Sequence, residues 1–116
     1  MARSKYGNRR VKADGYSFDS QAEHRRFIDL QTVEQGGLIT ALTVHPRYKV
    51  LDSYTYQGKR KQGIVYEGDF SYVEDGQLVV EDVKGRETEG FKLKRKLFEA
   101  RYPEIDLRII PVKDVA

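Results

Sequence analysis

Residues 68–85, GDFSYVEDGQLVVEDVKG, specify the central hairpin of this 116-residue chain. Two segments rich in valine and aromatic residues flank the dipeptide Asp75-Gly76. Asp-Gly favours a two-residue hairpin turn, because both central positions of that turn require positive φ. We therefore expect strands over 65–73 and 78–84, in a register that pairs Val73 with Leu78.

This register places two aspartates opposite each other, Asp69 and Asp82. Alternation along the strands directs Asp69, Asp82 and Lys84 to one side of the sheet and Glu81 to the other. Like charges that face each other on adjacent strands destabilise the pair, so we expect a cation between them. Lys84 and a divalent metal ion are the two candidates for that cation.

Length and composition indicate one small domain, which we place at residues 18–116 after a flexible basic arm over residues 1–17. The chain is 39% apolar and 34% charged, and it contains no cysteine and two histidines. Disulfides, thiolate zinc sites and a histidine-rich metal cage are therefore excluded. A metal would be held by carboxylate and carbonyl oxygens, which favours Mg²⁺, Mn²⁺ or Ca²⁺.

The apolar residues are scattered in short runs. None approaches the roughly 18 residues that a membrane-spanning helix needs, and no secretory apolar segment follows the N-terminus. We therefore expect a cytoplasmic protein that does not enter a membrane.

Basic residues are concentrated in three stretches, while the net charge is only +3. Clusters of this kind beside carboxylates favour a polyanionic partner, most simply nucleic acid, over the alternative of ordinary solvated surface. The candidate phosphate-binding residues are Arg3, Lys5, Arg9, Arg10, Lys12, Lys59, Arg60, Lys61, Lys92, Lys94 and Lys96.

The patterning predicts an α/β domain with a mixed sheet. A first helix is expected from an N-cap at Asp19 or Ser20 to the glycine pair 36–37, with Glu23 on its apolar face. Strands around 40–51 and then the hairpin are expected to follow, with residues 59–61 in a turn.

The second half of the chain is predicted to hold a helix over 88–101 and a last strand over 105–112. The helix would act as the crossover that brings the chain back to the sheet. The resulting order, αβββαβ, indicates a mixed central sheet flanked by helices.

Asp69, followed at a short interval by Asp82-Val83-Lys84 at the end of an apolar strand, resembles the motif of the PD-(D/E)XK nucleases. The element order is similar to the restriction-endonuclease-like core of that superfamily, and the likeness covers residues 18–112. The likeness is greatest to small phage-type endonucleases and to transposon endonuclease subunits. These proteins carry an acidic residue on the first helix, at the position that Glu23 occupies here. Gly68 departs from the motif, because the name of the motif places a proline directly before the first aspartate.

The resemblance implies a metal-dependent endonuclease that hydrolyses DNA. Asp69, Asp82 and Glu23, together with the carbonyl of Val83, would hold Mg²⁺ or Mn²⁺. Lys84 would orient or activate the attacking water and stabilise charge on the phosphate. No base-reading motif is present, so both structure-selective cutting of branched or recombining DNA and nonspecific nicking remain open. Cutting both strands would be easiest for a homodimer or a larger DNA-processing complex.

Three of these residues have ordinary structural alternatives. Glu23 completes a capping box with Ser20, in which its carboxylate would turn back to the Ser20 amide. Lys84 would face Glu67 across the hairpin and could simply pair with it. Asp69 could be a solvated acid at a strand edge.

Lys94 falls within the apolar arc expected for the second helix. There it would either reach the acidic cluster of Asp69, Asp82 and Glu23 or extend to solvent. Lys92 and Lys96 lie on the far side and are better placed for flanking phosphates. His24 and His45 are expected to be structural or surface residues. Two other functions stay open: a DNA-binding module with weak or partner-dependent catalysis, and an interaction protein whose acids form ordinary salt bridges.

Overall fold

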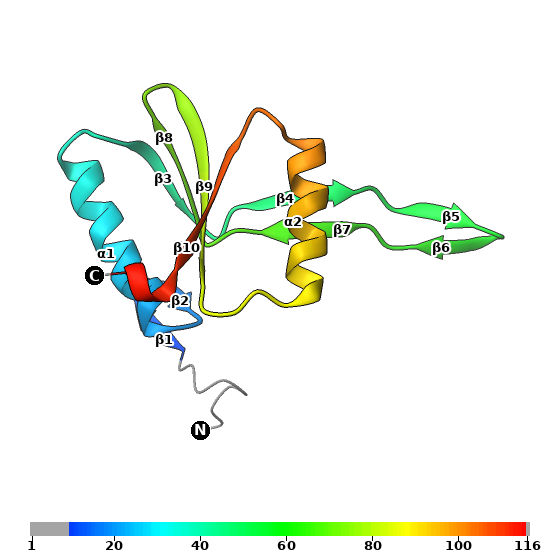
Figure 1. Ribbon diagram of the computed structural model, residues 1–116, viewed down its shortest axis with the longest axis horizontal. Coiled ribbons are helices and arrows are strands. Elements are labelled where there is room, and N and C mark those ends of the chain that lie inside the picture. Colours follow the sequence, from blue (N-terminus) through cyan, green and yellow to red (C-terminus); the bar gives the residue numbers. More distant parts are fainter. Residues whose placement is uncertain (1–9, 116) are drawn as a thin grey trace.

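A central sheet of four strands carries one helix on each face (Figure 1). The computed structural model describes residues 10–115, and no helix in that range has the length and apolar character needed to cross a membrane. The strand order is β10-β9-β8-β3, with β10 parallel to β9 and the other pairs antiparallel. The elements are α1 (Gln21–Gln35), β3 (Thr40–Val44), β8 (Phe70–Glu74), β9 (Gln77–Lys84), α2 (Glu89–Arg101) and β10 (Asp106–Pro111). The predicted mixed sheet with a helical crossover is therefore confirmed.

The β8–β9 hairpin has the predicted register. Val73 pairs with Leu78, and the turn residues Asp75 and Gly76 have φ values of 50° and 77°. Both lie in the left-handed region that a two-residue turn of this type requires. The ladder ends at the pair formed by Phe70 and Glu81.

The predicted strand over 65–73 is wrong at Gly68 and Asp69, where the chain bends. The Gly68 amide donates to the Pro46 carbonyl and the Asp69 amide to the Glu81 carbonyl, each at 2.9 Å. A Cβ atom at Gly68 would lie 2.7 Å from the Val80 side chain. Proline would also lack the N–H that this bend uses, which explains glycine at this position.

The bend separates β8 from β7 (Ile64–Glu67), which pairs instead with β4 (Arg47–Leu51). Glu67 lies opposite Arg47, with their charged groups 3.7 Å apart. The expected contact between Glu67 and Lys84 is therefore wrong, because β7 has left the side of β9 before Glu67 is reached.

Beyond β4 and β7 the same two segments continue as a second hairpin. It consists of β5 (Tyr54–Tyr56) and β6 (Lys59–Lys61), joined by a turn at Gln57-Gly58. Residues 59–61 thus form a strand, and the expected turn around them is wrong. The turn residues have φ values of 49° and 75°, the same left-handed pair as at the β8–β9 turn.

Residues 11–17 are predicted to belong to the flexible arm, and this prediction is wrong. Residues 11–18 are folded. They form a hairpin of β1 (Val11–Ala13) and β2 (Tyr16–Phe18), whose turn is Asp14-Gly15. Phe18 is fully buried between this hairpin, α1 and the sheet. Residues 1–9 of the predicted arm, which include Arg3, Lys5 and Arg9, lie outside the described residues.

Two apolar clusters cover opposite faces of the sheet. Phe27 and Leu30 of α1 pack against Phe70 on one face. Phe98 of α2 packs against Val80 on the other, together with residues of β4 and β7. Neighbouring residues of β9 therefore face different clusters. Whether a residue of β9 has an odd or an even number thus determines which helix its side chain faces.

The predicted apolar face of α2 is partly wrong. Phe98 is buried and Phe91 half-buried, but Leu93 is 56% exposed and Lys94 is exposed. Arg95 is half-buried instead. The residues of α2 that pack against the apolar cluster are Phe91, Leu97 and Phe98, and Lys94 lies outside this stripe.

Glu81 is a fully buried carboxylate on the α1 side of the sheet. Arg26 of α1 donates two hydrogen bonds to it, at 2.7 and 2.6 Å, and the Tyr72 hydroxyl donates a third. Strand alternation therefore assigned Glu81 correctly to the face opposite Asp82.

Replacing Arg26 by methionine is expected to destabilise the fold by about 3 kcal/mol, because it leaves Glu81 buried without a counter-charge. Urea unfolding measures this loss. The matched control is Arg25→Met, one position along the same helix on an exposed residue, which should cost far less. The double variant Arg26→Met with Glu81→Gln should recover part of the lost stability. Equal losses of stability in Arg25→Met and Arg26→Met would contradict the role given to Arg26.

Candidate active site

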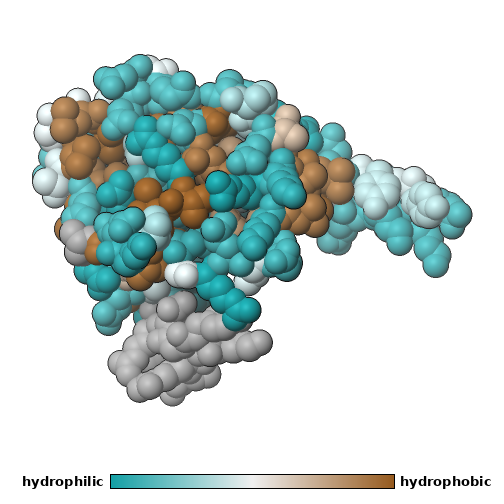
Figure 2. Space-filling view, in the orientation of Figure 1, coloured by the Kyte–Doolittle hydropathy of each residue, from teal (hydrophilic) through white to brown (hydrophobic). Residues whose placement is uncertain are grey.

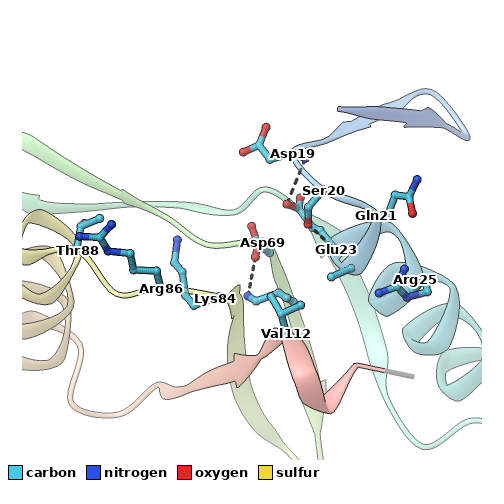
Figure 3. Close-up of a pocket in the computed structure, with 13 residues that line it drawn as sticks. Asp19, Ser20, Gln21, Glu23, Arg25, Asp69, Lys84, Arg86, Thr88 and Val112 are labelled. Carbon is cyan, nitrogen blue, oxygen red and sulfur yellow. Dashed lines mark hydrogen bonds between the residues drawn. The ribbon is translucent and has the colours of Figure 1, made fainter. Parts of the chain in front are cut away.

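An open pocket of about 690 Å³ lies where the first turns of both helices meet the end of β9 (Figure 3). Ser20 caps α1 and Thr88 caps α2, each accepting a hydrogen bond from a first-turn amide. The positive ends of two helix dipoles therefore face one cavity, which favours an anion there. The pocket is lined by Asp19, Ser20, Gln21, Ala22, Glu23, Arg25, Asp69, Val83, Lys84, Gly85, Arg86, Thr88 and Val112.

Asp69 lines this pocket from the bend that separates β7 and β8. Its side chain accepts a hydrogen bond of 2.7 Å from the Val83 amide, and its carbonyl accepts one of 2.9 Å from the His45 amide. Burial raises the pKa of Asp69, and the nearby carboxylates of Asp82 and Glu23 raise it further. Asp69 is thus a fixed side chain that resists ionisation in the metal-free protein.

Asp82 lies beside Asp69 but deeper, with 1% of its surface exposed, and does not line the pocket. The Tyr66 hydroxyl donates to Asp82, and Asp82 is close enough to Asp69 for its charge to raise the pKa of Asp69. Burial raises the pKa of Asp82, whereas Lys84 and Tyr66 lower it. Both carboxyl groups of the pair therefore resist ionisation in the metal-free protein.

Lys84 lines the same pocket from the last residue of β9. Its Nζ atom lies 3.7 Å from a carboxylate oxygen of Asp82 and 4.5 Å from the centre of the Phe91 ring. An ion pair and a cation–π contact thus hold the ammonium group in place. The structure brings Asp69, Asp82 and Lys84 together, although the bend at Asp69 ends the ladder before the two aspartates form a regular pair.

Glu23 is 4% exposed and lies at the start of α1. Its amide donates to the Ser20 side chain at 3.1 Å, as the capping-box alternative requires. Its carboxylate, however, accepts from the Asp19 amide at 3.3 Å and contacts His45 Nε2 at 3.0 Å. Glu23 therefore has a capping role, and its burial beside Asp69 raises its pKa and places it at the acidic cluster.

Sequence reasoning missed two residues of this cluster, His45 and Tyr66. His45, predicted to be a structural or surface residue, is half-buried and contacts Glu23 at 3.0 Å, which is consistent with a structural role. Pro46, which marks the bend after β3, was the signal that could have drawn attention to it. Nothing in the sequence pairs Tyr66 with Asp82, because that contact depends on the bend at Gly68.

The predicted phosphate-binding residues are not gathered in the pocket. Arg10 pairs with Asp19 at 3.4 Å, and Lys12 is exposed on β1. The three lysines of α2 are exposed, with Lys92 located 3.5 Å from Glu89. The basic side chains that do line the pocket are Arg25, Lys84 and Arg86.

The acidic residues supply the type of ligand that Mg²⁺ and Mn²⁺ prefer. Asp69 and Asp82 are adjacent, and Glu23 is near enough to affect the pKa of Asp69. Within residues 10–115, however, no three acidic or histidine side chains already form a metal site. Mg²⁺ commonly uses one or two protein carboxylates and completes its shell with water and substrate phosphate, so the donors fit such an ion.

The chain belongs to the family described as "Protein of unknown function (DUF1064)", whose sequence profile matches residues 3–114. No curated protein matches it. Because the profile spans nearly the whole chain, the pocket and the β5–β6 hairpin both lie within the region that defines the family.

Proposed function

We propose that this member of the family is a metal-dependent endonuclease of the PD-(D/E)XK type that hydrolyses phosphodiester bonds in DNA. The observation that carries the proposal is the adjacent pair of half-buried Asp69 and buried Asp82 beside Lys84, at the edge of an open pocket. In an ordinary structural ion pair each carboxylate has its own cation. Here the single ammonium group of Lys84 lies beside the two carboxyl groups of Asp69 and Asp82. Strongly raised carboxyl pKa values in a cleft are typical of functional sites.

The architecture also supports this proposal. The helix α1, the antiparallel strands, the helix α2 and the parallel strand β10 follow the αβββαβ order of the restriction-endonuclease-like core. The acid–x–lysine triplet stands at the end of β9, where the motif requires it.

Each residue has a distinct role in the proposed reaction. Asp69, Asp82, Glu23 and the Val83 carbonyl would hold Mg²⁺ or Mn²⁺, which when bound makes water more acidic and offsets charge on phosphate. Lys84, restrained by its two contacts, donates hydrogen bonds to the attacking water or to a phosphate oxygen. The Val83 amide and Tyr66 hydroxyl keep the two aspartates in their orientations.

The rim of the pocket suits a DNA backbone. Arg25 comes from the first turns of α1, and Arg86 from the loop between β9 and α2 (Figure 3). These guanidinium groups and the two helix N-termini lie on either side of Lys84, so a phosphate at Lys84 would have positive partners around it.

A binding module with weak or partner-dependent catalysis is the second candidate. The observation in its favour is that Asp82 is 1% exposed and already engaged by Tyr66 and Lys84. Together with the lack of a preformed metal site in the described residues, this favours a ligand set that is completed only with substrate or a partner.

Cleavage of supercoiled plasmid and of a four-way-junction oligonucleotide, with Mg²⁺ or Mn²⁺, tests the proposal. We expect metal-dependent cutting that EDTA stops, and a preference for the junction if cutting is structure-selective. Salt-sensitive binding without cutting would favour the binding module. If the protein neither cuts nor binds DNA, the acidic residues are ordinary salt-bridge partners.

A further inference from the structure

The β5–β6 hairpin, here called the ribbon, projects from the domain along its longest dimension, which measures 52 Å (Figure 1). All residues of both strands are exposed, and none belongs to either apolar cluster. Figure 2 shows the outer part of this projection in teal and white, without apolar brown. Because an isolated two-stranded hairpin adds little to stability, packing does not account for the residues that it carries.

The two faces of the ribbon differ in chemistry. Tyr54 pairs with Lys61 and Tyr56 with Lys59, so alternation places all four on one face. The other face carries Arg60, which donates to Thr55 at 3.4 Å and to the Ser53 hydroxyl at 2.7 Å. One face thus alternates tyrosine rings with lysine ammonium groups. On the other face, the Arg60 guanidinium group is hydrogen-bonded to neighbouring hydroxyl groups.

The charge of the ribbon is entirely positive. Residues 53–62 contain no aspartate or glutamate. Neither Lys59 nor Lys61 forms an ion pair within the described part of the chain, in contrast to Arg101, which pairs with Asp52 at 3.2 Å. A projecting surface of this composition is complementary to a polyanion, and its exposed tyrosines offer flat surfaces for sugars and bases.

We propose that the Tyr54–Tyr56–Lys59–Lys61 face lies in the major groove of duplex DNA while the pocket engages a phosphate of the same duplex. The inference rests on the proposed function and adds a substrate-positioning surface to it. The major groove, about 12 Å wide, admits a two-stranded ribbon. In this arrangement Lys59 and Lys61 contact phosphates and the tyrosines contact the groove wall.

A contact on the ribbon orients the duplex relative to the pocket, and so selects which phosphate reaches Lys84. Since the protein spans 52 Å and a base pair occupies about 3.4 Å of helix axis, the footprint cannot greatly exceed about 15 base pairs. A 20-base-pair duplex is therefore long enough to reach both surfaces at once.

The test compares variants of the proposed face with a control variant outside the ribbon, by their affinity for a 20-base-pair duplex at several salt concentrations. Lys59→Gln with Lys61→Gln is expected to weaken binding roughly tenfold and to lower the slope of log affinity against log salt by about 2. Tyr54→Ala with Tyr56→Ala should weaken binding several-fold at an unchanged slope. Lys113→Gln, which removes an exposed cation outside both the ribbon and the pocket, should have little effect.

The outcomes separate the ribbon from the catalytic proposal. Hydrolysis of bis-p-nitrophenyl phosphate, a diester too small to reach the ribbon, should be equal in the wild type and in the ribbon variants. Equal duplex affinity in wild type and the Lys59/Lys61 variant overturns the ribbon inference but leaves the nuclease intact. A loss of affinity for single-stranded DNA as large as for duplex overturns the groove assignment. If the wild type hydrolyses no diester, the nuclease fails, and the binding comparison still decides the ribbon.

Discussion

Lys84→Ala is expected to slow metal-dependent DNA cleavage by about 10³-fold, the upper range for removing one preorganised donor to developing charge. The ammonium group lines the pocket and is held by Asp82 and the Phe91 ring, so no other described lysine can replace it there. Affinity for DNA should change by less than about threefold, because the backbone is also contacted by other cations. Single-turnover cleavage rates and DNA binding in Ca²⁺ measure the two quantities separately.

Lys113→Ala is the matched control, since it removes one exposed lysine after β10 without touching the pocket. It should leave both quantities close to wild type. Cleavage that survives Lys84→Ala would remove this lysine from the mechanism. Equal losses of binding and cleavage would instead make Lys84 a phosphate-binding residue without a role in the chemical step.

The part of the site that could be predicted is the part that depends on local rules. The Asp75-Gly76 turn fixed the register of β8 and β9, and residue parity then separated Glu81 from Asp82. Both residues are buried, but Glu81 meets Arg26 on the α1 side while Asp82 meets Lys84 on the other. Two turn residues and alternation were therefore sufficient to place Asp82, and not Glu81, on the same side of the sheet as Lys84.

Contacts that depend on bends and on tertiary packing could not be predicted in this way. The break at Gly68 is set by a hydrogen bond to Pro46 and by the nearby Val80 side chain, and neither partner is close in sequence. The same break moves Glu67 away from Lys84. On α2, a helical projection shows an apolar arc but not which of its residues the sheet covers, and Lys94 was misplaced for that reason.

The N-terminal hairpin was missed for a different reason. Asp14-Gly15 carries the same turn signal as Asp75-Gly76, and Val11, Ala13, Tyr16 and Phe18 flank it in strand-like alternation. The basic composition of residues 1–12 was given more weight than this local pattern. Burial of Phe18 beside α1 shows that charge density along a segment is a poor guide to whether the segment folds.

Asp69→Asn is expected to stabilise the metal-free protein, although it removes a proposed metal ligand. The folded-state pKa of Asp69 is raised, so between its ordinary value of about 4 and the raised value the folded protein holds a proton that the unfolded chain releases. The contribution of Asp69 to stability is therefore greatest below pH 4 and falls as pH rises through this interval. Asparagine mimics the protonated acid at every pH and can still accept from the Val83 amide.

The melting temperature of Asp69→Asn in EDTA should accordingly match wild type near pH 4 and exceed it by about 5 °C near pH 8. Asp82→Asn also relieves repulsion, but it deprives Lys84 of its counter-ion, so its gain should be smaller. Adding Mg²⁺ or Mn²⁺ at pH 8 should stabilise the wild type and neither variant, because a cation that binds only the folded, ionised pair shifts the unfolding equilibrium. A melting temperature that falls for Asp69→Asn in EDTA at pH 8 would mean that the two acids stabilise the fold on their own, and would remove the main physical reason for placing a metal beside them.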